Sequence, residues 1–311
     1  MSTILYSHDD SLRHETPPGH PERVDRYRAV MRALSVPAFA GLDRREAPVA
    51  ARDEVLRCHP EDYVAAIERA IPVAGSVPLD PDTHASPGTL DAAMRAVGGV
   101  VAAVDAVLGG EAKAAFNAMR PPGHHAETAR AMGFCLFGNV AIGAKRALDH
   151  HGLERVAVVD FDVHHGNGTQ DLLWDEARAM FASTHQMPLY PGTGHPSEIG
   201  AHGTVLNVPL DPGSGSAAMR RAYDDVVLPA LDEFEPQLVL ISAGFDAHAA
   251  DPLANLMWTE ADFAWVTGRI CDIADAHAGG RVVSTLEGGY DLDALAASVA
   301  AHVTVLMERS G

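Results

Sequence analysis

Residues 156–167 read VAVVDFDVHHGN, and this stretch decides the fold class. It begins as a short run of apolar residues, which is typical of a strand buried on both faces of a sheet. Because successive side chains of a strand alternate between its faces, we expect Asp160, Asp162 and His164 to point to one side at its C-terminal end. Burying two carboxylates and an imidazole together is costly unless something compensates their charge. A divalent metal ion would do so.

The length and composition favour one large α/β domain. The chain has 311 residues, of which 47% are hydrophobic, and this supports a sizeable core. No linker, repeat or low-complexity segment divides the sequence, so we expect a single domain over residues 1–311. No apolar run approaches the roughly 18 to 20 residues of a membrane span, and the N-terminus lacks the basic and apolar regions of a signal peptide. The predicted location is the cytoplasm, with no membrane partner.

The cysteines and the net charge argue against a disulfide-stabilised protein and against a nucleic-acid-binding protein. Cys58, Cys135 and Cys271 are far apart and form no CxxC pair, which disfavours a disulfide framework and a cysteine-based zinc site. A formal net charge of −19 repels phosphate groups, so no nucleic-acid partner is expected. The acidity suits cationic partners such as basic peptides or polyamines. The alternative is that the negative charge serves only to keep the protein soluble.

Apolar strands alternate with helical patterns along the chain, which predicts a mostly parallel sheet with helices on both faces. The predicted strands are residues 3–6, 114–119, 156–160, 179–184, 205–208, 238–243 and 281–286. The predicted helices are residues 22–34, a helix opening near residue 60, 87–108, 138–151, 216–234, 259–278 and 292–307. In such sheets, ligands bind beyond the C-terminal ends of the strands.

Catalytic types of side chain follow four of these strands, at the edge where ligands are expected. His124 and His125 follow the strand at 114–119, and the polar residues 160–165 end the strand at 156–160. Asp246 follows the strand at 238–243, and Tyr290 follows the last strand. Separate strands therefore deliver reactive groups to the same place.

Asp162, His164 and Asp246 would form a site with two carboxylates and one imidazole. Three protein ligands leave a position open for water, which is the arrangement of a catalytic zinc site. Such a metal lowers the pKa of its bound water and polarises a substrate carbonyl. The alternative is that these residues cap helices or form turns after strands.

The remaining polar residues at this edge suit acid–base and oxyanion chemistry. In a Pro-Pro-Gly loop, His124 and His125 can both face a cleft, where one would act as general base and acid. Asp160 and Asn167 are available to orient them. Two glycines before Tyr290 let its hydroxyl swing toward a developing oxyanion. The alternatives are two surface histidines and a buried core tyrosine.

Six motifs give the chain a specific family resemblance. In chain order they are RPPGHH (120–125), GFC (133–135), DFDVHHGNGT (160–169), PGTG (191–194), SAGFDAH (242–248) and LEGGY (286–290), with His20-Pro21-Glu22 and Arg26 near the N-terminus. Together they resemble the zinc-dependent histone deacetylase superfamily, which includes bacterial class II-like amidohydrolases and acetylpolyamine amidohydrolases. The resemblance implies the arginase-deacetylase fold and the hydrolysis of an acetamide to acetate and an amine.

The resemblance also implies a role for each residue at the matching motif position. The ligands of one catalytic zinc ion, Zn²⁺, would be Asp162, His164 and Asp246. The implied catalytic set is His124, His125, Tyr290, Asp160 and Asn167. In this set His125 is the general base and acid with Asn167 as its partner, which is the class II form, and Asp160 supports His124. Tyr290 is the implied oxyanion donor.

Further residues are expected to contact the substrate or a second ion. Phe134 and Tyr190 would wall a narrow acyl channel, and Asp82, with Asp80 as the alternative, would hold the substrate backbone at its mouth. The expected substrate-contact set is Phe134, Tyr190, Gly133, Leu253, Asp82 and Gly288. The family also binds K⁺, for which the candidates, mainly through backbone oxygens, are Asp160, Asp162, His164, Ser183 and Thr184.

The resemblance leaves the identity of the amine open. Polyamine-selective relatives can carry Glu where Leu253 stands here, which favours an acyl-lysine or small-amide substrate, whereas the acidity of the chain favours polyamines. We expect deacetylation of acetyl-lysine or related N-acetyl alkylamines, with an acetylpolyamine deacetylase as the alternative. A manganese ureohydrolase is disfavoured, because it would need another carboxylate near His165 and Gly166. A non-catalytic acyl-ligand sensor is disfavoured as well, because the histidine pair, the zinc-ligand candidates and Tyr290 are all present. A homo-oligomer stays open.

Overall fold

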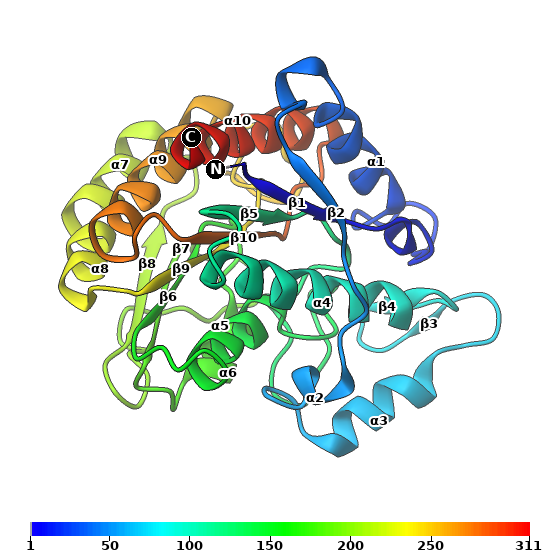
Figure 1. The fold of residues 1–311 in the computed structure, drawn as a ribbon. Helices are drawn as coiled ribbons and strands as arrows, with labels where there is room; N and C mark the ends of the chain where they lie inside the picture. The colour runs from blue at the N-terminus through cyan, green and yellow to red at the C-terminus, as the bar shows by residue number, and fades with distance from the viewer. Residues whose placement is uncertain (1) are drawn as a thin grey trace.

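The computed structural model describes residues 2–311, which Figure 1 shows as a ribbon. One sheet of 8 strands has the order β2-β1-β5-β10-β9-β6-β7-β8, and every neighbouring pair is parallel. The prediction of a mostly parallel α/β sheet is confirmed. The strands are β1 (Ile4–Ser7), β2 (Asp43–Glu46), β5 (Ala114–Asn117), β6 (Val156–Asp160), β7 (Ala179–Gln186), β8 (Val205–Leu210), β9 (Leu238–Ala243) and β10 (Val282–Leu286).

Helices cover both faces of the sheet, which explains why its strands are apolar throughout (Figure 1). One face carries α4 (Thr89–Leu108), α5 (Asn139–Asp149) and α6 (Asn167–Leu173), and the other carries α1 (Val24–Ala33), α7 (Ser216–Ala222), α8 (Leu228–Phe234), α9 (Glu260–His277) and α10 (Leu292–Ser310). Alternate residues of β6 enter the two cores: Val156 and Val158 pack on the α4 side, and Ala157 and Val159 on the other. Within residues 2–311, no helix has the length and apolar character needed to cross a membrane.

A smaller lobe lies beside the α4 face, at the lower right of Figure 1. It consists of α2 (Arg52–Val55), α3 (Glu61–Ala70) and an antiparallel pair of short strands, β3 (Val77–Pro78) and β4 (His84–Ala85). An apolar cluster that includes Val64 and Ile67 joins the lobe to Val97 of α4. The loop between β3 and β4 belongs to this lobe and carries Asp80 and Asp82, the two carboxylates expected at the channel mouth.

The edge strand β2 and the short helix α6 were not predicted from the sequence. The four residues of β2 read DRRE, so the strand has no apolar residue to reveal it. It pairs only with β1, at the edge of the sheet, where charged side chains discourage pairing with other chains. Arg45 of β2 is paired with Asp43 at 2.8 Å and with Glu111 at 2.7 Å.

The helix predicted at 216–234 is divided by a π-helical turn over Tyr223–Val227. Pro229 lies in the first turn of α8, directly after this segment. Because proline has no N–H, the carbonyl of Asp225, four residues earlier, cannot receive its usual α-helical hydrogen bond. Over this turn the backbone adopts π-helical hydrogen bonds, which span five residues instead of four.

The parallel register brings the C-terminal ends of the central strands together. Asp160 pairs with Ser183 of β7 and Ser242 of β9, while Ala243 pairs with Leu286 of β10. The segments that follow β6, β9 and β10 consequently leave the sheet side by side. These segments carry the motif residues that the sequence marked as reactive.

Candidate active site

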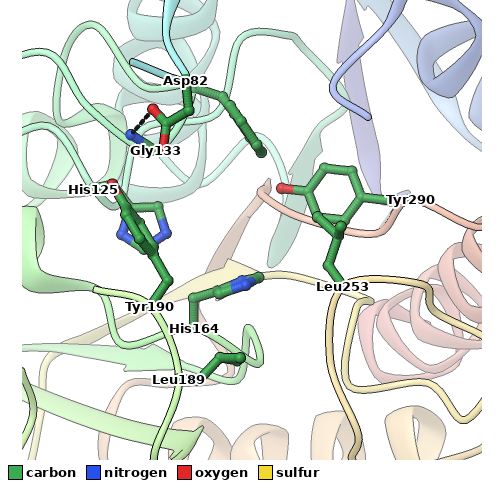
Figure 2. A pocket seen from close by; sticks show the side chains of 9 residues that line it. Asp82, His125, Gly133, His164, Leu189, Tyr190, Leu253 and Tyr290 are labelled. Carbon is green, nitrogen blue, oxygen red and sulfur yellow. Dashed lines mark hydrogen bonds between the residues drawn. The ribbon is translucent and has the colours of Figure 1, made fainter. Parts of the chain in front are cut away.

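A cavity of about 220 Å³ opens at this edge of the sheet (Figure 2). Figure 2 shows His125 and Tyr290 on opposite sides of the cavity, with the Tyr290 hydroxyl directed inward and His164 between them. Its walls come from several loops that are far apart in the sequence. The lining residues are Asp82, His125, Gly133, Phe134, His164, Leu189, Tyr190, Leu253 and Tyr290.

A cluster of side chains that could bind a metal ion lies at this cavity. It consists of Asp162, His164 and Asp246. Their ligand-type atoms all lie within 4.8 Å of one another, and all three residues are buried. His164 Nδ1 is 3.1 Å from Asp162 Oδ1 and 3.2 Å from Asp246 Oδ2. Asp162 and His164 follow β6, and Asp246 follows β9, so the parallel register is what brings them together.

The electrostatics of this cluster favour a bound cation. Burial alone would lower the pKa of His164, but its hydrogen bonds to Asp162 and Asp246 raise that pKa to about 10. Burial would raise the pKa of Asp162, yet the nearby His124 and His164 lower it below its usual range. Two carboxylates facing one imidazole nitrogen thus stabilise positive charge between them, and this nitrogen–oxygen donor set fits a zinc-type ion.

Two glycines let the carboxylates of the cluster lie against the backbone. Gly288 donates its N–H to Asp162 Oδ2 at 2.8 Å, and Val163 donates to Asp246 Oδ1 at 2.8 Å. A Cβ on Gly288 would lie 2.1 Å from Asp246 Oδ2, and one on Gly244 would lie 2.0 Å from Asp162 Oδ2. Any side chain at either position would displace the cluster. Gly288 is not a lining residue of the cavity, so its expected contact with substrate stays a prediction.

The adjacent histidines differ in their surroundings. His124 Nδ1 lies 3.0 Å from Asp160 Oδ2, and His125 Nδ1 lies 2.7 Å from Asn167 Oδ1. Burial would lower the pKa of His124, but the charges of Asp162 and Asp160 raise it well above its usual value. Burial and the neighbouring His124 and His164 lower the pKa of His125 well below its usual value. Of the two, the neutral His125 lines the cavity.

Asp160 lies outside the metal-binding type of cluster, although it was expected to point the same way as Asp162 and His164. Strand β6 ends at Asp160, so the alternation of a strand does not extend to the next residues. Its Oδ1 accepts a hydrogen bond from Asp162 N at 3.0 Å, while its Oδ2 contacts His124. Burial raises the pKa of Asp160 to about 6. Asp160 therefore supports both the loop and His124.

Tyr290 is held from three directions. Its backbone N–H donates to Asp251 Oδ2 at 2.7 Å, its ring packs edge-on against Phe134 at 5.8 Å, and the Arg26 guanidinium lies 5.0 Å from its ring centroid. Gly289, directly before it, has a φ of +119°, a conformation that other residues rarely adopt. Burial raises the pKa of the Tyr290 hydroxyl well above its usual value, so the group stays protonated as a hydrogen-bond donor.

Several supporting residues had no role in the sequence-based prediction. Glu287 is buried and accepts hydrogen bonds from Gly123 N at 2.7 Å and His124 N at 3.1 Å, which fixes the histidine loop. Asp251 holds the Tyr290 backbone, and Leu189 lines the cavity beside Tyr190. Glu287 stands inside the LEGGY motif, which was the available signal, whereas Asp251 and Leu189 had none beyond their neighbours.

Of the two carboxylates considered for the channel mouth, only Asp82 lies at the cavity, together with Tyr190 and Leu253. Asp82 lines the cavity, and its Oδ1 accepts a hydrogen bond from Gly133 N at 3.1 Å. Asp80, the alternative, does not line it and pairs with Arg130 at 3.1 Å. Tyr190 and Leu253 are 38% and 36% exposed, so both are accessible to a substrate that enters from solvent.

The side chains of the potassium candidates on β7 have other partners. Ser183 Oγ lies 2.9 Å from His185 Nδ1, and Thr184 Oγ1 lies 3.1 Å from the Tyr223 hydroxyl. A potassium ion at this position would therefore depend mainly on backbone oxygens. The ion itself stays a prediction.

Comparisons with known proteins agree with this geometry. The sequence pattern of the histone deacetylase domain matches residues 20–306. A probable deacetylase of Archaeoglobus fulgidus is 40% identical over 299 residues, covering 94% of this chain and 82% of the relative. A histone deacetylase-like amidohydrolase of Pseudomonas aeruginosa is 43% identical over 277 residues, covering 88% of this chain and 73% of the relative. The crystal structure of the HDA15 HD domain superposes with a TM-score of 0.94 at 33% identity, covering 100% of this chain and 91% of that one.

The chain therefore belongs to the histone deacetylase family. The family resemblance inferred from the motifs is confirmed, and so is the fold that it implied. Membership of this family of deacetylases and amidohydrolases supports a hydrolase that acts on amides.

Proposed function

We propose that this protein is a zinc-dependent amide hydrolase that removes acetyl groups from lysine side chains or similar alkylamines. One observation carries the proposal: His164 of the buried Asp162–His164–Asp246 cluster, a neutral His125 and Tyr290 all line one cavity. These are the groups that amide hydrolysis needs, namely a Lewis acid site, a base and an oxyanion donor.

His125 is the group that we assign to proton transfer. It lines the cavity, and its Nδ1 faces Asn167 Oδ1, which leaves Nε2 for the reaction. Nε2 would take a proton from the attacking water and later give it to the departing amine, so that acetate and a protonated amine leave. Because the pKa of His125 is lowered, the imidazole begins the reaction as a free base.

Tyr290 is assigned to the carbonyl oxygen of the substrate. Its hydroxyl faces the cavity opposite His125 and keeps its proton (Figure 2). A hydroxyl placed there donates a hydrogen bond that strengthens as negative charge develops on the oxygen. Phe134 and Tyr190, which also line the cavity, would enclose the alkyl chain of the substrate.

Asp162, His164 and Asp246 are the proposed metal ligands. A zinc ion bound to them would polarise the acetamide carbonyl and lower the pKa of water. A monovalent ion near the end of β6 remains part of the proposal, with K⁺ as the candidate. The cytoplasmic location and the absence of a nucleic-acid partner also stay predictions.

Acetyl-lysine is the favoured substrate and acetylpolyamine the second candidate. Leu253 at the rim offers no charge to a distal ammonium group, which supports acetyl-lysine or a broad range of small amides. Asp82 at the same rim supports a substrate with either a peptide N–H or a cationic amine. No further carboxylate joins Asp162, His164 and Asp246 in the metal-binding type of cluster within residues 2–311, which disfavours a two-metal ureohydrolase.

The experiment that tests this function compares acetate release across a set of substrates. Wild-type protein would be assayed with an acetyl-lysine peptide, acetylputrescine and acetylspermidine, and kcat/KM would be measured for each. A higher kcat/KM for the peptide supports the favoured substrate, and the reverse order supports the polyamine alternative. A complete lack of acetate release from all of them would refute the enzymatic proposal and leave the acyl-ligand sensor.

A further inference from the structure

The residue that supports the proposed general base has a charged partner of its own. Asn167 Oδ1 lies 2.7 Å from His125 Nδ1. On the other side of the same amide, Asn167 Nδ2 donates to Glu127 Oε1 at 2.8 Å and to Met132 Sδ at 3.4 Å. Asn167 is buried, and Glu127 is half-buried. The oxygen and the nitrogen of the amide are therefore both in use.

The chemistry of a carboxylate determines which way the Asn167 amide faces. An ionised carboxylate only accepts hydrogen bonds, so the amide nitrogen must point to Glu127. If the amide were flipped, its oxygen would face the Glu127 carboxylate at hydrogen-bonding distance, and two acceptors would repel each other. Glu127 consequently holds the Asn167 oxygen toward His125.

The contact with Asn167 also determines which nitrogen of the His125 imidazole carries the hydrogen. The Asn167 oxygen can only accept, so His125 Nδ1 must carry the hydrogen of that contact. A neutral imidazole has one N–H, and Nε2 is then left without a proton. The order Glu127, Asn167, His125 thus selects the tautomer whose free nitrogen can act as a base.

We infer that Glu127 is a positioning residue that sets the amide orientation of Asn167 and, through it, the tautomer of His125. The inference rests on the proposed role of His125 as the general base. Glu127 itself does not line the cavity. It acts through Asn167, so its loss should lower kcat and leave KM almost unchanged.

The loop that carries Glu127 is attached to the helix that carries Asn167. Glu127 N donates to Arg130 O at 3.0 Å and Arg130 N donates to Glu127 O at 3.3 Å, which closes a short turn. Within this turn, Thr128 donates from N at 2.7 Å and from Oγ1 at 2.6 Å to Asp171 Oδ2. Asp171 is four residues after Asn167 in α6, so both contacts lie on one face of the helix. The loop and the helix therefore hold Glu127 in place against Asn167.

A charge change at Asn167 distinguishes this role from simple packing. In Asn167→Asp, a second carboxylate would face Glu127 at hydrogen-bonding distance, and the repulsion would displace the new side chain from His125. Removing the charge of Glu127 in the double variant Asn167→Asp/Glu127→Gln lets the glutamine amide donate to the new carboxylate. The substitution Glu127→Gln should thus be mildly harmful in the wild type and beneficial beside Asn167→Asp.

The experiment measures kcat and KM for acetate release from an acetyl-lysine peptide, with thermal unfolding of each variant as a check of folding. Glu127→Ala should lower kcat by about tenfold with KM within about twofold, as is usual for residues that orient a catalytic group. Glu127→Gln should retain at least about a third of the wild-type kcat, since its oxygen can still accept from Asn167. Asp175→Asn, which changes an exposed carboxylate two residues after the end of α6, serves as the control and should stay within about twofold.

The double variant provides the decisive comparison. Asn167→Asp should be at least about tenfold slower than wild type, and adding Glu127→Gln should recover several-fold of that loss. If Glu127→Ala keeps the wild-type kcat, or if Glu127→Gln slows Asn167→Asp further, the inference is wrong even though the enzyme is active. If wild-type protein releases no acetate from any acetamide, the proposed function fails and the inference fails with it.

Discussion

Arg26 lies over the ring of Tyr290, with its guanidinium carbon 5.0 Å from the ring centroid. The same guanidinium donates hydrogen bonds to the carbonyls of Gly289, at 2.6 Å, and of Glu287. Arg26 is fully buried and is paired with Glu22 at 3.1 Å. A single cation from α1 therefore fixes both the backbone before Tyr290 and the phenol itself.

Replacing Arg26 should impair catalysis as well as stability. Arg26→Met would leave two buried carbonyls without a donor, which costs about 2 kcal/mol or more, and would release the Tyr290 ring. We expect kcat to fall by about tenfold and the melting temperature to fall by several degrees. Arg28→Met is the matched control, because Arg28 lies on the same helix but pairs with Asp25 at the surface. An Arg26→Met protein with wild-type kcat would show that Tyr290 does not depend on this contact.

Removing the Tyr290 hydroxyl should slow the reaction while leaving the metal site intact. Tyr290→Phe keeps the ring packing against Phe134 and Arg26 but deletes the proposed oxyanion donor. Loss of one such donor lowers kcat by about 10² to 10³. Zinc content, measured by elemental analysis, should equal that of the wild type because Tyr290 is not among the metal-ligand candidates. Near-normal turnover would remove Tyr290 from the mechanism.

A charge at position 253 should change the substrate preference. Leu253 lines the cavity and is partly exposed, so Leu253→Glu would place a carboxylate at the rim. A carboxylate there attracts the distal ammonium group of acetylspermidine. We expect the ratio of kcat/KM for acetylspermidine to that for acetyl-lysine peptide to rise by about tenfold. Leu253→Gln, of similar size but uncharged, should leave the ratio within about twofold, and an unchanged ratio in Leu253→Glu would contradict the assignment of Leu253 to the substrate rim.

His302 should make the stability of the protein depend on pH. It is buried in the core, where its ring nitrogens contact Thr267 Oγ1 at 2.7 Å and Ser284 Oγ at 2.9 Å, and burial lowers its pKa from 6.5 to about 3. The unfolded state binds a proton more readily, so the stability contributed by neutral His302 is complete above pH 6.5 and is lost as pH falls toward 3.

The measurement for His302 compares the free energy of unfolding of wild type and His302→Gln across this pH range. The advantage of the wild type should shrink by about 1.4 kcal/mol for each pH unit below about 6.5. His195→Gln, at an exposed histidine, is the control and should show no such trend. A wild-type advantage that stays constant from about pH 7 to about pH 4.5 would contradict the assignment of a neutral, buried His302.

The sequence was sufficient to predict the central sheet because its strands are apolar and end in polar motifs. The residues 156–160 form β6 as predicted, and the parallel register explains why Asp246 lies beside Asp162. β2 was not predictable from hydrophobic alternation, since its residues DRRE depend on pairing with β1.

Residues that support the site from outside the cavity were harder to predict than those that line it. Gly288 shares a motif with Tyr290, but only the three-dimensional structure shows that it donates a hydrogen bond to Asp162, one of the metal-ligand candidates. Glu127 and Asp251 act through contacts to residues far away in the sequence, and such contacts leave no periodic pattern. Arg26 was noted only as part of a motif, because its contacts with Tyr290 span the whole chain.

The central claim is that a metal held by Asp162, His164 and Asp246 is required for amide hydrolysis. The most direct measurement is acetate release from an acetyl-lysine peptide by protein that has been stripped of metal with a chelator and then titrated with Zn²⁺. We predict that activity is lost on stripping, returns in proportion to added Zn²⁺ up to about one equivalent, and does not return in Asp246→Ala. Full acetate release from the metal-free protein would contradict the account.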